Sequence, residues 1–415
     1  MVYRICSISG GGVRGIIPAT IIERMLNYSK SKGGKGNIAD LCDHVVGTSI
    51  GGLIGAGLVV SKDGEPIYAP SEIREMFLEK ASVIFSKPYC KESYILDFLD
   101  YFFNTVGYIY DVNLRKFHIP LPFLAVPAVL FFWGAPALAA IYAPKAALSL
   151  IAFVTVSTFF ASYKLQDLME NPTQYCLTRK FYEPAYESNG LNEVLEEKFA
   201  ETTLNDTLLP FTTFSFSLKN NSLVSYSTFK AQSDKSKNFY LKDALRATSA
   251  APTYFPRTSE HEVDAGICLN SPISAAVTVV KKYGSEEVKQ KIASEGISVL
   301  SIGTGIFSHR DLHKNFTHGE GLLSWVKHFS KVTMSGTEQQ SIMDGIYLHN
   351  TSRVDIDLHI DLPMDTADLR QITALQNSVV QADFDSIFAY EDCIASLGKA
   401  EACFVHYPDE SYFRY

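Results

Sequence analysis

Twice near its N-terminus, the chain runs from a strand-like segment through a glycine-rich turn into a helical segment. The first unit has a strand over residues 2–9, a turn at 10–15 and a helix over 17–30. The second has a strand at 44–46, a turn at 47–52 and an apolar helix toward Val60. Repeated strand–turn–helix units are typical of α/β folds, so we predict a central, mostly parallel sheet covered by helices.

Further elements of this sheet are predicted along the chain. Residues 211–228 alternate like two paired strands with a turn at Asn220-Asn221, and 297–302 has the apolar pattern of a buried strand. Helices are also predicted. A helical pattern runs from about residue 70 to about Val106, and residues 241–251 have helical spacing. Residues 366–397 are expected to form a closing helix over the core.

Composition excludes some functions. The net charge of -8 and pI of about 5.7 give no general basic field, so nucleic acid is not an expected partner. Seven cysteines without paired or zinc-like spacing predict reduced thiols and no metal site. With no secretory signal visible, we expect a cytoplasmic protein, and no oligomeric state is indicated.

Two uncharged runs, 119–144 and 146–163, each have about the length of a bilayer span, roughly 17–25 residues. Arg115 and Lys116 precede them and Lys164 follows, which fits both outer ends facing the cytoplasm. We predict a hydrophobic helical hairpin inserted at 117–163 and associated with the membrane. Its prolines leave open a re-entrant or surface-lying arrangement, and a buried apolar subdomain is the other alternative.

The second turn, Gly47-Thr48-Ser49-Ile50-Gly51, matches the GxSxG elbow that presents a nucleophilic serine between a strand and a helix. Glycines at 47 and 51 let neighbouring chain approach the strained turn closely. The following helix points its N-terminal dipole at the site and favours an oxyanion. Ser49 is therefore the candidate nucleophile.

The first turn, residues 10–15, exposes consecutive backbone N–H groups that can converge on a developing negative charge. Its letters also satisfy GxGxxG, so a dinucleotide site is the rival interpretation. That site expects an acidic residue about 20 residues on, at the end of the second strand. Residues 29–37 contain no acid and the second strand ends at Ser49 instead, which disfavours the rival.

A serine nucleophile needs a base. None of the ten histidines lies in a context typical of a catalytic triad, and we interpret His44 and His261 as ordinary surface or loop residues. Asp264 ends a short strand at 262–264, and Gly266 allows close approach. A carboxylate there can accept the serine proton if burial raises its pKa toward working pH.

The motifs SGGGVRG, GTSIGG and VDAG, in this order, resemble the three signatures of the patatin-like phospholipases. Residues 247–256 and 301–305 resemble that family too, although Ser9 and Ala265 stand where Asp and Gly are commoner. The resemblance implies a patatin-like three-layer α/β fold and a dyad of Ser49 and Asp264 without histidine. It also implies an oxyanion hole of the Gly11, Gly12 and Val13 amides, with supporting roles for Gly10, Arg14, Gly15, Gly47, Gly51 and Gly266.

The expected function is hydrolysis of acyl esters in membrane phospholipid or lysophospholipid, without metal or organic cofactor. A transacylase or thioesterase with the same dyad, and a catalytically silent membrane-tethered scaffold, remain alternatives. Residues 1–116 and 164–415 are predicted to form one catalytic domain interrupted by the hairpin. Because the dyad members flank it, the hairpin must return to the face where it starts.

Overall fold

The computed structural model describes residues 2–86, 183–305, 322–356, 358 and 362–381. The chain divides into two compact units, residues 1–87 with 186–415, and residues 88–185. All elements described below belong to the first unit, and the predicted hairpin at 117–163 lies outside the described residues. Among the helices that are described, none combines the length and apolar character needed to cross a membrane.

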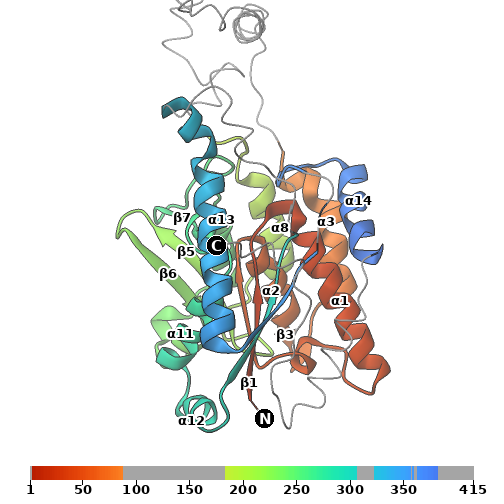
Figure 1. The fold of residues 1–415 in the computed structure, drawn as a ribbon, viewed down its shortest axis with the longest axis vertical. Coiled ribbons are helices and arrows are strands. Elements are labelled where there is room, and N and C mark those ends of the chain that lie inside the picture. Colours follow the sequence, from red (N-terminus) through yellow and green to blue (C-terminus); the bar gives the residue numbers. More distant parts are fainter. Residues whose placement is uncertain (1, 87–182, 306–321, 357, 359–361, 382–415) are drawn as a thin grey trace, which may run out of the picture. The chain divides into compact units, whose positions relative to one another are not determined.

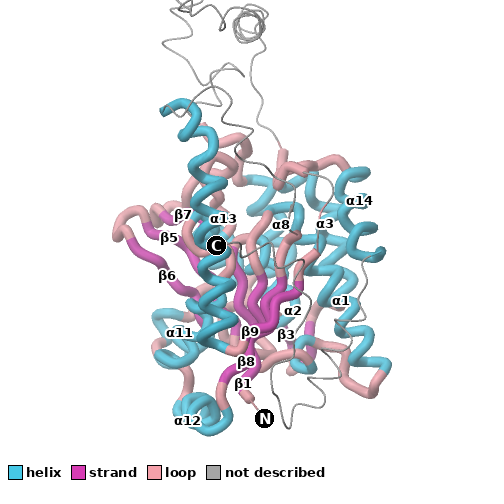
Figure 2. Tube along the Cα trace, in the orientation of Figure 1, coloured by secondary structure: helices cyan, strands magenta, loops and turns pink. Residues whose placement is uncertain are grey.

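The main sheet has seven strands: β1 (Tyr3–Ile8), β2 (His44–Thr48), β5 (Phe211–Ser217), β6 (Ser222–Ser227), β7 (Glu262–Asp264), β8 (Ile297–Ile302) and β9 (Thr351–Val354). Their order is β6-β5-β2-β1-β8-β9, and β7 pairs with β5. The pairs β1–β2, β1–β8, β2–β5 and β8–β9 are parallel, whereas β6 and β7 run antiparallel to β5. The predicted mostly parallel sheet is thereby confirmed (Figure 2). A separate hairpin joins β3 (Ser61–Lys62) and β4 (Glu65–Pro66).

Helices cover both faces of the sheet, which gives three layers (Figure 1). One face carries α1 (Ile16–Ser31), α2 (Ile50–Val59), α3 (Pro70–Ile84), α8 (Asn189–Phe199), α10 (Leu241–Thr248) and α14 (Leu369–Gln381). The other carries α9 (Thr228–Ser233), α11 (Ile273–Tyr283), α12 (Glu286–Glu295) and α13 (Leu322–His349). The short 3-10 turns are η1 (Gly12–Gly15), η2 (Ile38–Asp40), η6 (Lys235–Lys237) and η7 (Ala265–Ile267).

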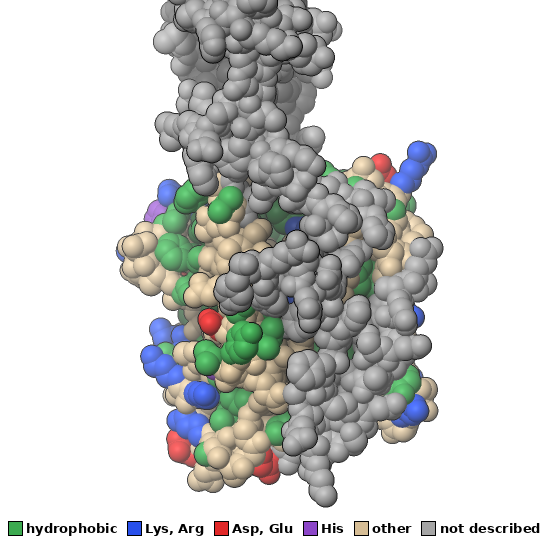
Figure 3. All heavy atoms as spheres, viewed as in Figure 1, with side chains coloured by type: hydrophobic (Ala, Val, Ile, Leu, Met, Phe, Trp, Pro, Cys, Tyr) green, Lys and Arg blue, Asp and Glu red, His purple; other side chains and the backbone are tan. Residues whose placement is uncertain are grey.

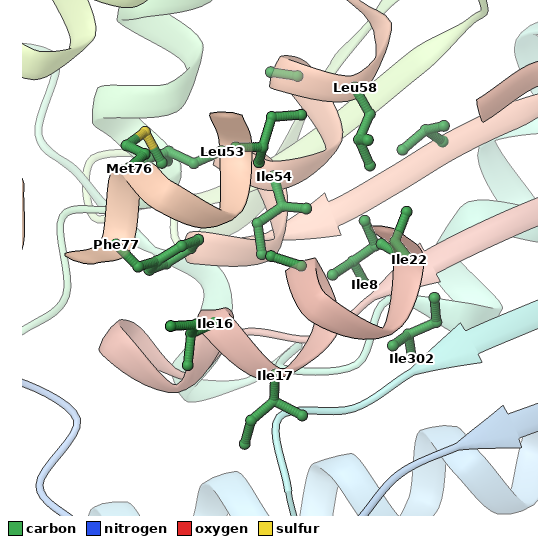
Figure 4. Close-up of a cluster of buried hydrophobic side chains, with 14 of the residues drawn as sticks. Ile8, Ile16, Ile17, Ile22, Leu53, Ile54, Leu58, Met76, Phe77 and Ile302 are labelled. Carbon is green, nitrogen blue, oxygen red and sulfur yellow. The ribbon is translucent and has the colours of Figure 1, made fainter. Parts of the chain in front are cut away.

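Two apolar cores result because successive strand residues point to opposite faces of the sheet. In β2, Val45 joins the core beneath α1 and α2, whereas Val46 joins the core beneath α11. In β8, Leu300 likewise joins the core beneath α1 and α2, and Val299 joins the core beneath α11. Figure 4 shows the first core, in which Ile8 and Ile302 from the strands lie near residues of α1 and α2. Because these strands are buried on both faces, apolar residues occur at successive positions in them, as at Ile5-Cys6, Val45-Val46 and Val299-Leu300.

Most charged side chains of the described residues lie on the outside of these layers, with Asp264 and Arg353 among the buried exceptions. On the face shown in Figure 3, lysine and arginine side chains gather toward the lower left, where α11 and α12 lie. Lys281 and Lys282 close α11 at this end. Acidic side chains lie there as well, and since β1 begins at the same lower end, these charged helices are at the amino ends of the parallel strands.

Two of the predicted helical segments extend beyond the described residues. The helical pattern expected to continue to Val106 is described only as α3, which ends at Ile84, and the residues from 87 onward lie outside the described part. The closing helix expected over 366–397 is described as α14, over 369–381.

The thiols of Cys6 and Cys42 are free and buried, and that of Cys268 is free and half-buried.

Candidate active site

Ser49 lies at the junction of β2 and α2, with φ 55° and ψ −127°. This left-handed backbone is strained for a residue with a side chain, so other contacts must hold it. Its N–H donates to Thr248 Oγ1 at 2.9 Å, and its carbonyl accepts the Gly52 N–H at 2.9 Å. A Cβ on Gly47 would lie 2.2 Å from the Gly51 carbonyl oxygen, so this turn closes only around glycine.

Gly51→Ala should destabilise the fold, since its Cβ would lie 2.4 Å from the carbonyl oxygen of Ile8, the last residue of β1. We expect the free energy of unfolding to fall by about 1–3 kcal/mol or more, the usual effect of overpacking. Gly336→Ala is the matched control, because Gly336 is also helical but its Cβ would meet nothing within 4 Å. Denaturant unfolding should show that variant unchanged or slightly more stable; equal losses in both variants would contradict the steric account.

Asp264 is the last residue of β7 and is almost completely buried, with 4% of its surface exposed. Burial raises the pKa of its carboxyl to about 7. The Gly266 N–H, which donates to Oδ1 at 2.7 Å, and the nearby Ser49 hydroxyl oppose this rise because both favour the carboxylate. Ser49 and Asp264 therefore lie side by side in one cavity wall, although 215 positions separate them in the chain.

The carboxyl end of α10 holds both of these residues by their backbones. Thr248 Oγ1 accepts the Ser49 N–H, and two residues later the Ala250 carbonyl accepts the Asp264 N–H at 3.0 Å. One short segment thus fixes the amide of the serine and the amide of the aspartate.

The glycine loop, residues 10–15, follows β1 and adjoins the elbow. The Gly10 N–H donates to the Asn270 carbonyl at 3.0 Å, and the Gly10 carbonyl accepts from Thr304 Oγ1 at 3.0 Å. Among the described residues, no acceptor engages the N–H of Gly11 or Gly12. The Val13 N–H, in contrast, donates to the Met364 carbonyl at 2.8 Å. Of the three expected oxyanion donors, the Gly11 and Gly12 amides have no acceptor among the described residues, whereas the Val13 amide already has one.

Arg14 and Gly15 complete this loop as the second half of η1. The half-buried Arg14 lies close enough to Tyr254 to oppose the rise in the pKa of that phenol, which burial causes. Gly15 is buried, and a Cβ there would meet Ile50 at 2.7 Å and Phe77 at 2.8 Å. The loop therefore packs directly onto α2 and α3.

A cavity of about 290 Å³ opens beside these residues. Gly11, Gly12, Val13, Ser49 and Asp264 all line it, as does Gly266. Most of its remaining wall is apolar and comes from α2, α3 and residues 251–255, including Leu53, Met76, Phe77, Ile84, Phe85 and Phe255. Such a cavity suits a hydrocarbon chain whose polar end reaches the serine.

The two histidines considered from the sequence have different positions. His261 lies in an exposed turn before β7, as expected. The prediction that His44 is a surface or loop residue is wrong, because it is fully buried in β2, where its Nε2 lies 2.9 Å from Thr212 Oγ1. Burial lowers the pKa of this imidazole to about 3. Neither histidine lines the cavity.

Several residues of the site were not predicted from the sequence. Thr248, Asn270 and Met364 contact the elbow or the glycine loop, and Arg353 lies behind them. Asn270 follows Asp264 by six residues, which is the one signal that could have indicated it. In the described part of the chain, no three side chains of His, Cys, Asp or Glu gather as a ligand set for a metal ion.

Comparison with known proteins adds independent findings. A model of the patatin-like phospholipase family matches residues 6–277, which include the glycine loop, the elbow and Asp264. Patatin-like protein 2 of Arabidopsis thaliana is 25% identical over 83% of this chain and 70% of its own length. Patatin-like protein 2 of Oryza sativa subsp. indica is 25% identical over 78% of this chain and 65% of its own length. The chain thus spans about two thirds of the length of these relatives.

Among solved structures, VipD from Legionella pneumophila aligns with 91% of this chain and 67% of that one, at 15% identity and a TM-score of 0.34. A TM-score this low carries no conclusion about the fold.

Proposed function

Since the chain belongs to the patatin-like phospholipase family, we propose that it hydrolyses acyl esters of membrane phospholipids or lysophospholipids through a dyad of Ser49 and Asp264. One observation carries the proposal. Asp264, buried with a pKa raised to about 7, lies beside Ser49 in the wall of a largely apolar cavity. A base whose pKa lies near working pH is the most effective acceptor of the serine proton.

The reaction proceeds in two halves. Asp264 takes the Ser49 hydroxyl proton while Oγ attacks the ester carbonyl carbon, and the resulting oxyanion accepts hydrogen bonds from the Gly11 and Gly12 amides. The positive end of the α2 dipole stabilises the same charge. The intermediate then expels the alcohol, which takes the proton from Asp264, and leaves an acyl-enzyme. Water, deprotonated by Asp264, releases the fatty acid and restores the serine.

The Val13 amide joins the oxyanion hole only if its bond to the Met364 carbonyl opens. We therefore assign the first two donors to Gly11 and Gly12. Val13 would be a third donor in the substrate complex.

The direct test is fatty acid release from vesicles by the purified full-length chain, across a panel of phospholipid and lysophospholipid headgroups. Release, together with labelling of Ser49 by a fluorophosphonate, supports the proposal. A silent scaffold would give neither signal. A transacylase or thioesterase would instead transfer the acyl group to added alcohols, or cleave thioesters faster than oxygen esters.

We further propose that the insertion at 117–163 holds the enzyme on its substrate membrane, since it consists almost wholly of uncharged residues. About 0.8 kcal/mol per buried methylene is available to such an anchor. Deleting these residues should move the protein from the vesicle pellet to the supernatant in a sedimentation assay. Cleavage of a short soluble ester should be largely retained. If the shortened protein still pellets with vesicles, the anchor lies elsewhere.

A further inference from the structure

A buried arginine lies behind the glycine loop. Arg353, in β9, has only 4% of its side chain exposed. Its Nη1 donates to Ser9 Oγ at 2.9 Å and to Ser301 Oγ at 2.8 Å. Ser9 directly precedes the glycine loop, and Ser301 lies near the end of the neighbouring β8. The guanidinium therefore joins three adjacent strands where two of them lead into loops of the site.

Glu338, on α13, connects this arginine to the wall of the cavity. Its Oε1 accepts from Arg353 Nη2 at 3.0 Å, and its Oε2 accepts from Asn270 Nδ2 at 3.1 Å. Asp355 accepts from the same Nη2 at 2.8 Å and receives the Gly305 N–H on its other oxygen at 2.7 Å. A guanidinium between two carboxylates makes charge-assisted bonds, which are shorter and stronger than neutral ones. The bond to Arg353 therefore fixes the Glu338 carboxylate in the position where it accepts from Asn270.

Asn270, which is bound to Glu338, contacts the glycine loop directly. Its carbonyl accepts the Gly10 N–H, and its side-chain Oδ1 lies 2.6 Å from where a Cβ on Gly10 would be. The same Cβ would lie 3.2 Å from the Cβ of Ser49. Contacts therefore run from Arg353 through Glu338 and Asn270 to Gly10, which immediately precedes the two open amides.

We propose that Arg353, Glu338 and Asn270 are positioning residues that hold the Gly11 and Gly12 amides toward the oxyanion formed on Ser49. A run of glycines has large conformational freedom and no side chains with which to anchor itself. Oxyanion stabilisation nevertheless requires donors that are oriented before the reaction begins. The three residues supply that order from outside the loop. This inference rests on the proposed hydrolase function.

Exchanging donor and acceptor between two of these residues provides the test. Glu338→Gln leaves one acceptor oxygen for two donors, Arg353 and Asn270. Asn270→Asp sets two carboxylates against each other. In the double variant, the new amide at 338 donates to the new carboxylate at 270, while its oxygen still accepts from Arg353. All three variants keep the size of the side chains and leave buried Arg353 in place, so none opens a cavity or removes the cation between the two carboxylates.

Each single variant should lower kcat by about 10- to 100-fold, somewhat less than complete loss of an oxyanion donor, with KM changed by less than about threefold. The double variant should regain about tenfold. It should be compared at about pH 9, since the carboxylate at 270 raises the pKa of Asp264. Glu287→Gln, on the exposed surface of α12, is the isosteric control and should match wild type. A purely structural role would leave kcat of the folded single variants within about twofold.

Hydrogen exchange of the peptide spanning residues 9–15 gives a readout without catalysis. Exchange should be faster in each single variant and slower again in the double variant. Unchanged exchange in the singles, or a double variant no better protected than they are, would overturn the inference. Because this measurement needs no substrate, it distinguishes failure of the positioning role from failure of the proposed hydrolase function.

Discussion

Replacing Ser49 with alanine is expected to reduce lipid hydrolysis by about 10⁴- to 10⁶-fold, the range seen when a nucleophilic serine is lost from a hydrolase. The fold should persist, because the elbow is held by the Ser49 backbone N–H on Thr248 and by the Ser49 carbonyl, not by the hydroxyl. Alanine adopts the same φ at a cost similar to that of serine. The measurement is fatty acid release from vesicles, with circular dichroism to establish that the variant is folded.

Ser294→Ala, at an exposed position of α12, is the control for this substitution and should retain full activity. Fluorophosphonate labelling should disappear in Ser49→Ala and remain in the control. Residual hydrolysis within about tenfold of wild type would exclude Ser49 as the nucleophile and remove the basis of the proposed mechanism.

The second large effect concerns Asp264 and pH. If Asp264 is the base, kcat/KM should rise with pH through a midpoint near 7 and then level off, because only the carboxylate can accept the serine proton. Asp264→Asn should lose about 10²- to 10⁴-fold in rate at pH 8. A midpoint near 4, the value of an ordinary exposed carboxyl, would show that the titrating group is not this buried aspartate.

The raised pKa of Asp264 also predicts that stability falls over the pH range in which activity rises. Between about pH 4 and 7, folded Asp264 keeps a proton that the unfolded chain has released, so the free energy of unfolding falls as pH rises through this window. Asparagine does not titrate, and Asp264→Asn should therefore become more stable than wild type as pH rises. The gain should reach at most about 4 kcal/mol near pH 8, at roughly 1.4 kcal/mol for each of about three pH units.

Denaturant unfolding of both proteins at about pH 4, 6 and 8 measures this difference. An inactive variant that is more stable than the enzyme would mean that the buried charge is retained at a cost to folding. A difference independent of pH would contradict the raised pKa of Asp264.

The sequence predicts strands better than it predicts the helices that flank them. Strands β1, β2 and β8 are recognisable because each contains consecutive apolar residues and leads into a glycine-containing turn, as expected for parallel strands buried on both faces. The glycine turns after β1 and β2 were equally clear, since few residues other than glycine allow such close approach. These features are local in the chain, and each is determined by a few neighbouring residues.

Helices α11, α12 and α13 and strand β9 were not predicted. In α12 the described side chains include none that is buried, so its apolar periodicity is weak. Strand β9 contains Arg353, and a charged residue argues against a buried strand unless its partners are known. Those partners, Glu338 and Ser9, come from other elements, so only the folded structure reveals why the arginine is there.

Part of the candidate site can be predicted because Ser49, Asp264 and the glycine loop belong to short motifs. Thr248 and Asn270 reach the site only through contacts with residues distant in the chain. The burial of His44 also depends on neighbouring strands and on Phe229, whose ring lies 5.2 Å away. Contacts of this kind leave no spacing pattern in the chain.

Because Thr248 and Ala250 hold the amides of Ser49 and Asp264 within three consecutive residues, both reacting groups share a single support. Ser49 also continues β2 and Asp264 ends β7, so a displacement of residues 248–250 relative to the strands would strain the hydrogen bonds at both amides at once. A substitution that disturbs this segment should therefore affect both residues together.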